Sequence, residues 1–420
     1  MKLIYIHQHF VTNEGTAGTR SYDVSKHIVA AGHEVTMICG IYWQGSLARM
    51  PWWRPWRTEQ IDGIKVVVCN VCYANQMGPL LRVWRFLKFA LLATVVAIGE
   101  KRTDIIFATS TPLTVGIPAR IAAAVKRIPY IFEVRDLWPE DLLAAGRMKP
   151  GLVYRGWEAL ERFAYAKARR ILLVSKGFHD RLLERGLPPD RLETILLGAD
   201  GALFENLTPN QAYFAQHGLA GKTIAVYTGS YGNANGLFQV LDAAAHLRDR
   251  PDIALVLIGD GKERAELEAI KAQKDLANVH LLPFVKKHEL PDILAACHVG
   301  LMILKQITRP RWVTPNKLFD YMFAGLPTIV NFPGTTAELI EAEGAGVAAL
   351  PGDPVDLAAK IRHYADHPDE RRAVGARARQ VAFARFDRAQ IAARLIEVMQ
   401  DVIAGRSSGP ASVPSQTSAS

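Results

Sequence analysis

The sequence has little cysteine, which excludes a fold that depends on disulfide bonds. Its 420 residues include four cysteines and 49% hydrophobic residues, so the chain can bury large cores without covalent cross-links. Cys69 and Cys72 have the C-x-x-C spacing, but no second pair and no nearby histidine completes a metal site. We therefore expect buried thiols, a reducing compartment and, from the length of the chain, two domains.

The sequence also lacks an apolar run suited to a signal peptide or a membrane span. The N-terminus, "MKLIYIHQHF", has an apolar run too short for a signal peptide and is typical of a buried first strand. Segment Pro79–Gly99 is longer, but Arg82, Arg85 and Lys88 would each cost about 2.5–3.5 kcal/mol near the bilayer centre. On a helix these cations share one arc, which suits a helix at the membrane surface or a sheet-covering helix equally well.

No nucleic-acid-binding signature is present, so the net charge of +9 needs another explanation. Residues 1–200 contain 27 Lys and Arg against 18 Asp and Glu, and the rest of the chain is balanced. The stretch "MPWWRPWR", Met50 to Arg57, adds three tryptophans in an expected loop. Tryptophan with arginine suits a headgroup layer, a carbohydrate or a protein contact. We predict that the N-terminal half meets an anionic membrane surface and that no nucleic acid is bound.

Apolar strand-like runs alternate with segments of helical period along the chain, from "KLIYIHQHF" to "GVAALPG". This alternation predicts an α/β fold with two doubly wound, Rossmann-like domains that face a cleft. A polar stretch, Gly198 to Asn210, interrupts the pattern and is the expected linker. We expect one domain over 1–205, completed by a C-terminal crossover helix over 387–404, a second over 206–386, and a disordered tail over 405–420.

Glycines follow several of the expected strands. Gly15 and Gly18 lie in the turn after the first strand, "NEGTAGTR", and Gly229 and Gly259 follow later strands in "YTGSYG" and "LIGDG". Such turns let a phosphate approach backbone amides, although turn geometry alone also explains them. A nicotinamide-binding domain is disfavoured, because G-x-G-x-x-G is missing from the first turn and no ribose-binding acid follows the second strand.

The stretch "TPNKLFDYMFAGLPTIV" predicts a helix whose first turn holds an anion. Pro315 suits the first turn of a helix, where the amides of Asn316, Lys317 and Leu318 would point along the axis. Lys317 would add a full charge toward a diphosphate, and Asp320 could accept hydrogen bonds from sugar hydroxyls. The alternative is an exposed ion pair between Lys317 and Asp320.

These motifs, together with "AAGHEVT", "EVRDLWPE", "LLVSKGF" and "ILLGAD", resemble the retaining glycosyltransferases of the GT4 family, which have the GT-B fold. The resemblance covers the chain except its tail. It is strongest, through "EVRDLWPE" and "TPNKLFDYM", to bacterial L-fucosamine-type transferases that build O-antigen or capsule repeats on a polyprenyl diphosphate. The family implies a hexosyl transferase that uses a UDP-sugar and needs neither a cofactor nor a bound metal.

By this resemblance the site residues fall into three groups. The catalytic residues would be Asp136, which orients sugar or acceptor, and Lys317. The donor-binding residues would be Gly15, Thr16, Gly18, Gly229, Ser230, Gly259, Phe284, Asn316, Lys317, Leu318 and Asp320, with Asp320 at the donor ribose. The acceptor-binding residues would be Arg20, Arg135, Trp138 and Glu140, with Arg135 on an anion such as the acceptor diphosphate.

The sequence departs from the family pattern at several positions. Trp312 stands where the family has the first of its two acids, and Ser230 and Asn235 replace a frequent arginine and lysine. Lys317 is therefore expected to be the main cation on the diphosphate. His7 and His9 alternate along the first strand and should point to opposite faces, so they share no metal. No other His, Asp or Glu group shows metal-ligand spacing.

The function expected from sequence is sugar transfer from a UDP-sugar, for example UDP-N-acetyl-L-fucosamine or a related amino sugar, to a polyprenyl-diphosphate-linked saccharide. The enzyme would act in lipopolysaccharide, O-antigen or capsule biosynthesis, on the cytoplasmic face of the membrane. Two alternatives stay open. One is a UDP-sugar epimerase or hydrolase of the same fold, and the other is an inactive membrane-associated partner subunit.

Overall fold

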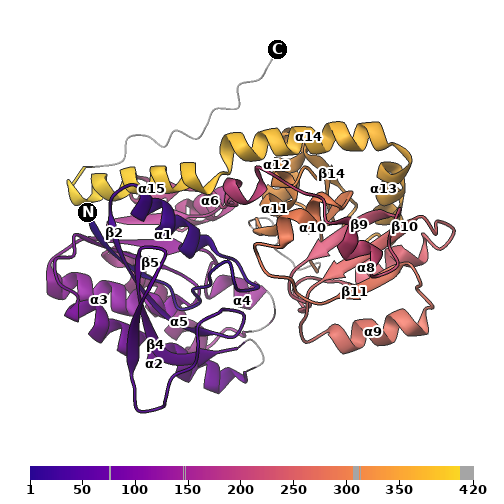
Figure 1. Ribbon diagram of the computed structural model, residues 1–420. Coiled ribbons are helices and arrows are strands. Elements are labelled where there is room, and N and C mark those ends of the chain that lie inside the picture. The colour runs from indigo at the N-terminus through magenta and orange to yellow at the C-terminus, as the bar shows by residue number, and fades with distance from the viewer. Residues whose placement is uncertain (75–76, 145, 147, 306–311, 313, 407–420) are drawn as a thin grey trace. The chain divides into compact units, whose positions relative to one another are not determined.

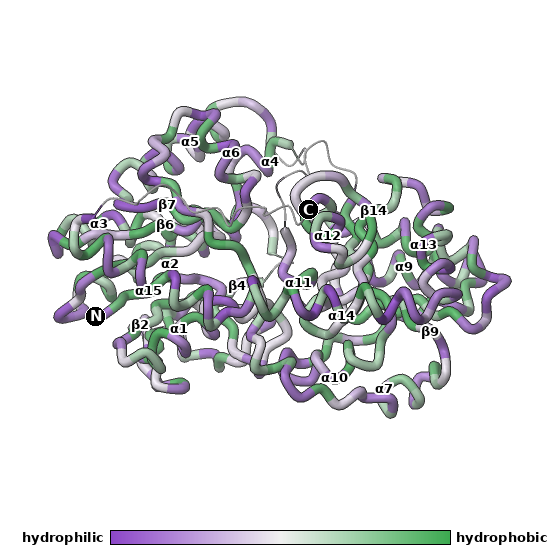
Figure 2. Tube along the Cα trace, turned by 90° about the horizontal axis from the view of Figure 1, so that it is seen from above, coloured by the Kyte–Doolittle hydropathy of each residue, from purple (hydrophilic) through white to green (hydrophobic). Residues whose placement is uncertain are grey.

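The computed structural model describes residues 1–420 except 75–76, 145, 147, 306–311, 313 and 407–420. Strands alternate with helices along the chain (Figure 1). Hydrophobic and hydrophilic stretches are interleaved along the trace (Figure 2), as expected when apolar strands are covered by amphipathic helices. The predicted α/β class with two Rossmann-like sheets is confirmed.

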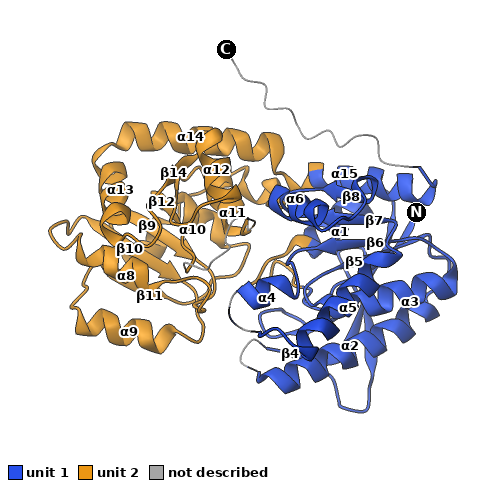
Figure 3. Ribbon diagram, turned by 180° about the vertical axis from the view of Figure 1, so that it is seen from behind, with its two compact units in different colours: residues 1–10, 21–196, 391–420 blue, residues 11–20, 197–390 orange. Residues whose placement is uncertain are grey.

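The chain divides into two compact units, coloured separately in Figure 3. Unit 1 contains residues 1–10, 21–196 and the chain from Ile391, and unit 2 contains residues 11–20 and 197–390. The short segment 11–20, which holds the first glycine turn, therefore groups with unit 2 although the chain on both sides of it belongs to unit 1.

Unit 1 is built on an eight-stranded sheet with the order β3-β4-β2-β1-β5-β6-β7-β8. Its strands are β1 (Lys2–Ile6), β2 (Glu34–Tyr42), β3 (Trp56–Ile61), β4 (Ile64–Tyr73), β5 (Ile105–Thr109), β6 (Tyr130–Val134), β7 (Arg170–Leu173) and β8 (Leu192–Thr194). Neighbouring strands are parallel except β3 and β4, which form an antiparallel hairpin. Asp62 and Gly63 form its turn with positive φ values, as an Asp-Gly hairpin turn requires.

Along the chain, the helices of unit 1 lie between these strands, except the last helix, which follows the last strand of unit 2. They are α1 (Arg20–Ala30), α2 (Pro79–Gly99), α3 (Gly116–Lys126), α4 (Glu140–Ala144), α5 (Leu152–Ala166), α6 (Lys176–Glu184) and α15 (Arg388–Ile403). Helix α15 occupies the segment predicted as the C-terminal helix, and Leu395 and Met399 on it join a core with Leu3, Tyr5 and Phe107 of the sheet. The predicted tail lies outside the described residues apart from Gly405 and Arg406.

Unit 2 is built on a six-stranded parallel sheet with the order β11-β10-β9-β12-β13-β14. Its strands are β9 (Thr223–Thr228), β10 (Ile253–Ile258), β11 (Val279–Leu282), β12 (Val299–Met302), β13 (Thr328–Val330) and β14 (Gly346–Ala348). The sheet's apolar side chains form a second core, which includes Leu255, Leu301 and Ile329. Parallel strands place their carboxyl ends at one edge, so the loops that follow them gather there.

The helices of unit 2 are α7 (Gln211–Ala215), α8 (Phe238–Ala245), α9 (Arg264–Gln273), α10 (Leu290–Ala295), α11 (Lys317–Phe323), α12 (Thr335–Ala342), α13 (Pro354–Asp366) and α14 (Pro368–Arg385). The predicted linker contains a 3₁₀ helix, Gly201–Phe204, and Ala199 in it pairs with Asp387. This stretch is therefore more ordered than a linker made only of loop.

The tryptophan-rich stretch differs from the loop that the sequence predicted. Trp56 and Arg57 begin β3, so only its first part is loop. Trp52 and Trp53 are exposed by 87% and 69%, whereas Trp56 is half-buried in the hairpin. Trp56 and Arg57 pair with β4 in an antiparallel hairpin, although Pro55 directly before them favours a turn. Among the described residues, no helix is long and apolar enough to cross a membrane.

Candidate functional site

Lys317 begins helix α11 and places its ammonium beside the last residues of β9. Its Nζ lies 3.6 Å from the ring centroid of Tyr227, a cation–π distance. A Cβ atom at Gly229 would lie 3.1 Å from this Nζ, and the φ of Gly229 is 134°. Glycine at this strand end therefore supplies both the backbone conformation and the space that the ammonium occupies.

The surroundings of Lys317 make its charge costly. Burial lowers the pKa of Lys317 to about 7, and the carboxylate of Asp320 only partly opposes this shift. The ring of Tyr227 is the near partner of the ammonium, and a ring face compensates a charge less than a hydrogen-bonded anion does. An anionic ligand at this position would restore the charged form.

Asp320 is held by a residue that the sequence reasoning missed. The carboxylate lies 2.5 Å from Nζ of Lys287, and each of the two side chains is only 9% exposed. The alternative of an exposed Lys317–Asp320 pair is therefore wrong. Lys287 donates to Oδ1 of Asp320. Because a carboxylate has several lone pairs, Asp320 can also accept a hydrogen bond from a hydroxyl group of a ligand. Lys287 follows β11, and its position after a parallel strand is the signal that would have found it.

The first glycine turn contacts this group within unit 2. The Lys287 N–H donates to the carbonyl of Gly15 (3.2 Å), and Glu14 forms an ion pair with Lys286 (3.0 Å). A Cβ atom at Gly18 would lie 3.2 Å from Nδ2 of Asn316. The structure thus brings the predicted glycine turn and the predicted helix start together.

Two predicted amide contacts need correction. The Gly15 N–H donates to the Thr12 carbonyl (2.9 Å), and the Leu318 N–H donates to the Pro315 carbonyl (3.1 Å). Both amides close tight turns, so the prediction that they face a ligand is wrong for these two groups. Thr16 lies in the same glycine turn and is half-buried.

The loops after β9 and β10 touch through their glycines. A Cβ atom at Gly259 would lie 1.9 Å from the carbonyl oxygen of Gly229, so only glycine fits there. The carbonyl of Ser230 accepts from the Tyr227 hydroxyl (3.0 Å) and from Nδ2 of Asn235 (2.7 Å). Ser230, through its carbonyl, and Asn235, through its side chain, therefore stabilise this loop. Phe284 is half-buried in the loop after β11.

In unit 1, Arg135 and Asp136 directly follow β6. The Arg135 N–H donates to Oγ of Ser110 (2.9 Å), and the Thr111 hydroxyl donates to the Asp136 carboxylate. Burial, reinforced by the neighbouring Asp136 carboxylate, raises the pKa of Asp141 to about 7. Asp141 was not predicted from the sequence. It is a carboxyl group that gains or loses a proton near neutral pH.

The two histidines near the end of β1 also lie beside this group. The expectation that they face opposite sides is wrong, because residues two apart in an extended chain point to the same face; β1 itself ends at Ile6. The rings of His7 and His9 are 6.4 Å apart, and His9 lies against Tyr42 and Tyr73. Burial, with Arg135 as the next cause, lowers the pKa of His9 to about 3 and also lowers that of His7.

Both imidazoles are therefore neutral at physiological pH. Among the described residues, Nε2 of His9 and both side-chain polar atoms of Gln8 are buried without a hydrogen-bond partner. Buried polar groups are usually hydrogen-bonded, so these atoms could pair with a ligand or with water.

The remaining predicted acceptor residues lie in packed surroundings. Trp138 contacts the rings of Phe86 and Trp157 (6.4 and 5.2 Å between centroids). Glu140 begins α4 and accepts two hydrogen bonds from Nε of Arg181 (3.0 and 3.1 Å). Arg20 is 1% exposed and groups with unit 2, unlike the other three.

Two family models match most of the chain. Residues 15–198 match the glycosyl transferase 4-like domain, and residues 209–381 match the glycosyl transferases group 1 domain. Among curated proteins, WcaI of Escherichia coli K12, named as a colanic acid biosynthesis glycosyl transferase, is 23% identical over 359 residues, covering 82% of this chain and 87% of WcaI.

Solved structures show the same fold. Anabaena HepE in complex with UDP-glucose superposes with a TM-score of 0.71 at 19% identity, over 96% of this chain and all of HepE. Sucrose-phosphate synthase from Thermosynechococcus elongatus superposes with a TM-score of 0.75 at 16% identity, over 96% of this chain and 99% of that one. The chain therefore belongs to the GT4-type glycosyltransferases of the GT-B fold, with a glycosyl transferase 4-like domain followed by a group 1 domain.

Proposed function

We propose that the enzyme transfers a sugar from a UDP-sugar to a polyprenyl-diphosphate-linked saccharide in the biosynthesis of a surface polysaccharide. The observation that carries the donor assignment is Lys317, a cation whose charge the surrounding protein disfavours until an anion arrives. The UDP-glucose complex of HepE and the colanic acid role in the name of WcaI support the same reaction class.

On the donor side, Lys317 would bind the diphosphate where Gly229 leaves room for it. The buried Lys287–Asp320 pair would present the Asp320 carboxylate to the ribose hydroxyls. Asn316 and Gly18, which lie together, would complete the site, with Thr16 in the same turn. Ser230, Gly259 and Phe284 would shape its wall through the loops after β9, β10 and β11.

In unit 1, Arg135 would bind an anion of the acceptor, and Asp136 would orient an acceptor hydroxyl, with Trp138 and Glu140 beside them. In a retaining transfer, the bond from the sugar to the diphosphate breaks and the acceptor oxygen bonds on the same face. The leaving diphosphate oxygen takes the acceptor's proton, so no protein nucleophile is needed. The protein contributes positioning and charge stabilisation, with Lys317 on the leaving group.

The donor sugar that the resemblance favours is UDP-N-acetyl-L-fucosamine or a related amino sugar. The motifs "EVRDLWPE" and "TPNKLFDYM" support this narrower assignment. A panel of UDP-sugars with and without N-acetyl groups, compared by turnover, tests it. Equal or faster turnover of UDP-glucose than of every amino sugar would contradict it.

We also propose that unit 1 binds the inner face of the membrane peripherally. Helix α2 buries one apolar face, which includes Phe86, Phe89 and Ala93. The exposed side of α2 is apolar as well: it carries Leu80, Trp84, Leu87, Leu91, Val95 and Ile98. Arg82, Arg85 and Lys88 are half-buried, and Arg82 lies over the ring of Tyr73 on the buried side of the helix. The exposed apolar stripe by itself suits insertion into a lipid headgroup layer.

Product analysis tests the reaction. The full-length protein is incubated with the UDP-sugar panel and a polyprenyl-diphosphate-linked saccharide, and products are identified by mass spectrometry. We expect a lengthened lipid-linked saccharide, a loss of about 100-fold in rate for Lys317→Ala, and no loss for the exposed control Lys101→Ala. Free sugar or an altered UDP-sugar would instead indicate the hydrolase or epimerase. Donor binding without any turnover would indicate an inactive partner subunit.

A further inference from the structure

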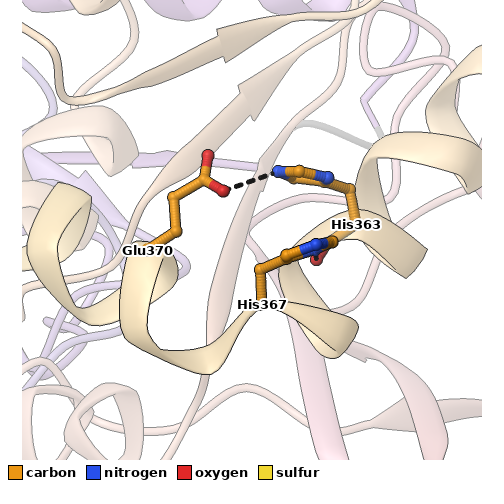
Figure 4. A group of neighbouring side chains, drawn as sticks. All are labelled: His363, His367 and Glu370. Atoms are coloured by element: carbon orange, nitrogen blue, oxygen red, sulfur yellow. Dashed lines mark hydrogen bonds and ion pairs between the residues drawn. The ribbon is translucent and has the colours of Figure 1, made fainter.

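We propose that unit 2 carries a transition-metal site, formed by His363, His367 and Glu370, that binds Zn²⁺. One ligand atom from each residue lies within 4.8 Å of the other two, and all three residues are exposed. Figure 4 shows the side chains converging where α13 ends and α14 begins. The site goes beyond the proposed function and corrects the expectation that no such group has metal-ligand spacing.

The sequence spacing explains why these side chains meet. His363 lies in the last turn of α13, and His367, four residues on, precedes α14. Residues four apart lie on the same side of a helix, and the two rings stack with centroids 4.3 Å apart. Pro368 then starts α14, which places Glu370 in its first turn and brings its carboxylate back to His363.

The hydrogen bonds prepare the ligand atoms. Nδ1 of His367 lies 2.8 Å from the carbonyl of His363, and only a protonated nitrogen can donate to a carbonyl. The lone pair of His367 therefore resides on Nε2. A histidine ligand usually donates its other N–H to such a carbonyl, which fixes its tautomer and orientation. Nε2 of His363 lies 2.9 Å from Oε2 of Glu370, so these two groups are already adjacent.

The donor set indicates the kind of ion. Two imidazoles and one carboxylate suit Zn²⁺, whose bonds of about 2.0–2.1 Å place tetrahedral ligand atoms about 3.3 Å apart. The ligand atoms, which lie within 4.8 Å of one another, would have to move closer, and the two stacked rings would have to rotate toward the ion. Exposed side chains are free to make these movements. Mg²⁺ and Ca²⁺ prefer all-oxygen ligands, whereas Cu²⁺ and Ni²⁺ would compete for the same nitrogen atoms. Water would supply the fourth ligand.

Neighbouring cations are occupied elsewhere. Arg371 donates to the carbonyl of Tyr364 (2.9 Å), and Arg372 pairs with Asp369. The exposed His363–Glu370 contact contributes little stability by itself. A bound ion would instead fasten the end of α13 to the start of α14, so it would stabilise the folded protein in proportion to its affinity.

Zinc binding by the untagged full-length chain tests the proposal. Zn²⁺ is titrated against a chromogenic chelator, with C72S present in every variant because Cys72 is the thiol that is not fully buried. We expect one Zn²⁺ per chain, at least about tenfold weaker binding for H367A and E370Q, and no change for H246A, an exposed histidine outside the triad.

Co²⁺ gives a second readout, because its visible absorption reports nitrogen coordination and should be lost in H367A. Thermal melting in EDTA checks that each variant folds. If H367A does not fold, the zinc affinity of E370Q tests the site, because glutamine keeps the shape of the glutamate side chain. Absence of a stoichiometric site in the parent chain, or equal affinities for E370Q and H246A, would overturn the proposal.

Discussion

At the residue level, we expect Lys317 to couple donor binding to the uptake of a proton. Burial holds its pKa at about 7 in the free protein, so the side chain is increasingly neutral above that pH. A bound diphosphate favours the charged form and raises the pKa, so binding above pH 7 takes up a proton. We therefore predict that affinity for a UDP-sugar falls as pH rises from 7 to 9, by up to about tenfold per unit.

Calorimetry at pH 8 in two buffers of different ionisation enthalpy measures this proton uptake. A UDP-sugar is the suitable ligand, because its diphosphate diester does not titrate in this range. The Lys317→Ala variant should bind weakly and without proton uptake. An affinity that stays constant from pH 7 to 9 in the wild type would show that Lys317 is charged before the donor arrives.

The buried Lys287–Asp320 pair should behave as a coupled unit. Its atoms are 2.5 Å apart and nearly inaccessible, so removing one partner leaves the other charge buried and unpaired. We predict that Asp320→Asn or Lys287→Met alone lowers the free energy of unfolding by about 3–5 kcal/mol, and that the double variant costs less than the sum. Urea unfolding measures this; additive effects would mean that the pair is not coupled in solution.

At the scale of elements, the loops after β9 and β10 depend on glycine. A side chain at Gly259 would collide with the carbonyl of Gly229, whereas a Cβ atom at Gly232 would have its nearest neighbour, Ser230, 3.6 Å away. We predict that Gly259→Ala costs about 1–3 kcal/mol of stability and weakens donor binding, because one of the loops must shift. Gly232→Ala serves as the matched control. Equal effects of the two substitutions in thermal melts and donor titrations would refute the role of the close approach.

The apolar stripe of α2 makes a separate prediction. Replacing Leu87 and Leu91 by glutamate should reduce binding to vesicles containing phosphatidylglycerol by at least about tenfold, since each buried leucine contributes about 1.5–3 kcal/mol. Leu350→Glu alters an equally exposed leucine of unit 2 and should have no effect. High salt should weaken the electrostatic part of vesicle binding. Vesicle flotation measures the effects of the substitutions and of salt. Unchanged flotation of the double variant would show that α2 does not contact the membrane.

For the whole molecule, the parts of the fold that could be predicted are those whose sequence signal is local. Alternating strands and helices predicted both sheets, because parallel strands leave long apolar runs in the sequence. Pro315 and the apolar run that follows it predicted the helix that begins at Lys317. Family resemblance then supplied the reaction class, which neither pattern contains.

The contacts that complete the site join distant parts of the chain, and no local pattern reveals which residues pair with one another. Lys287 and Asp320 are 33 residues apart, and Glu14 and Lys286 are 272 residues apart. These pairings depend on the strand ends that meet at one edge of the sheet. The packing of the whole unit determines which strand ends meet. The predicted opposite orientation of His7 and His9 was wrong for a local reason, because residues two apart in an extended chain point to the same face.

Calorimetric titration of a UDP-sugar at pH 7 decides whether the donor site is built around Lys317. Wild type, Lys317→Ala and Lys101→Ala are compared, with the donor chosen from the panel by turnover. We expect one site per chain, a loss of at least about tenfold in affinity for Lys317→Ala, and wild-type affinity for Lys101→Ala. Equal affinities for wild type and Lys317→Ala would show that Lys317 does not bind the donor.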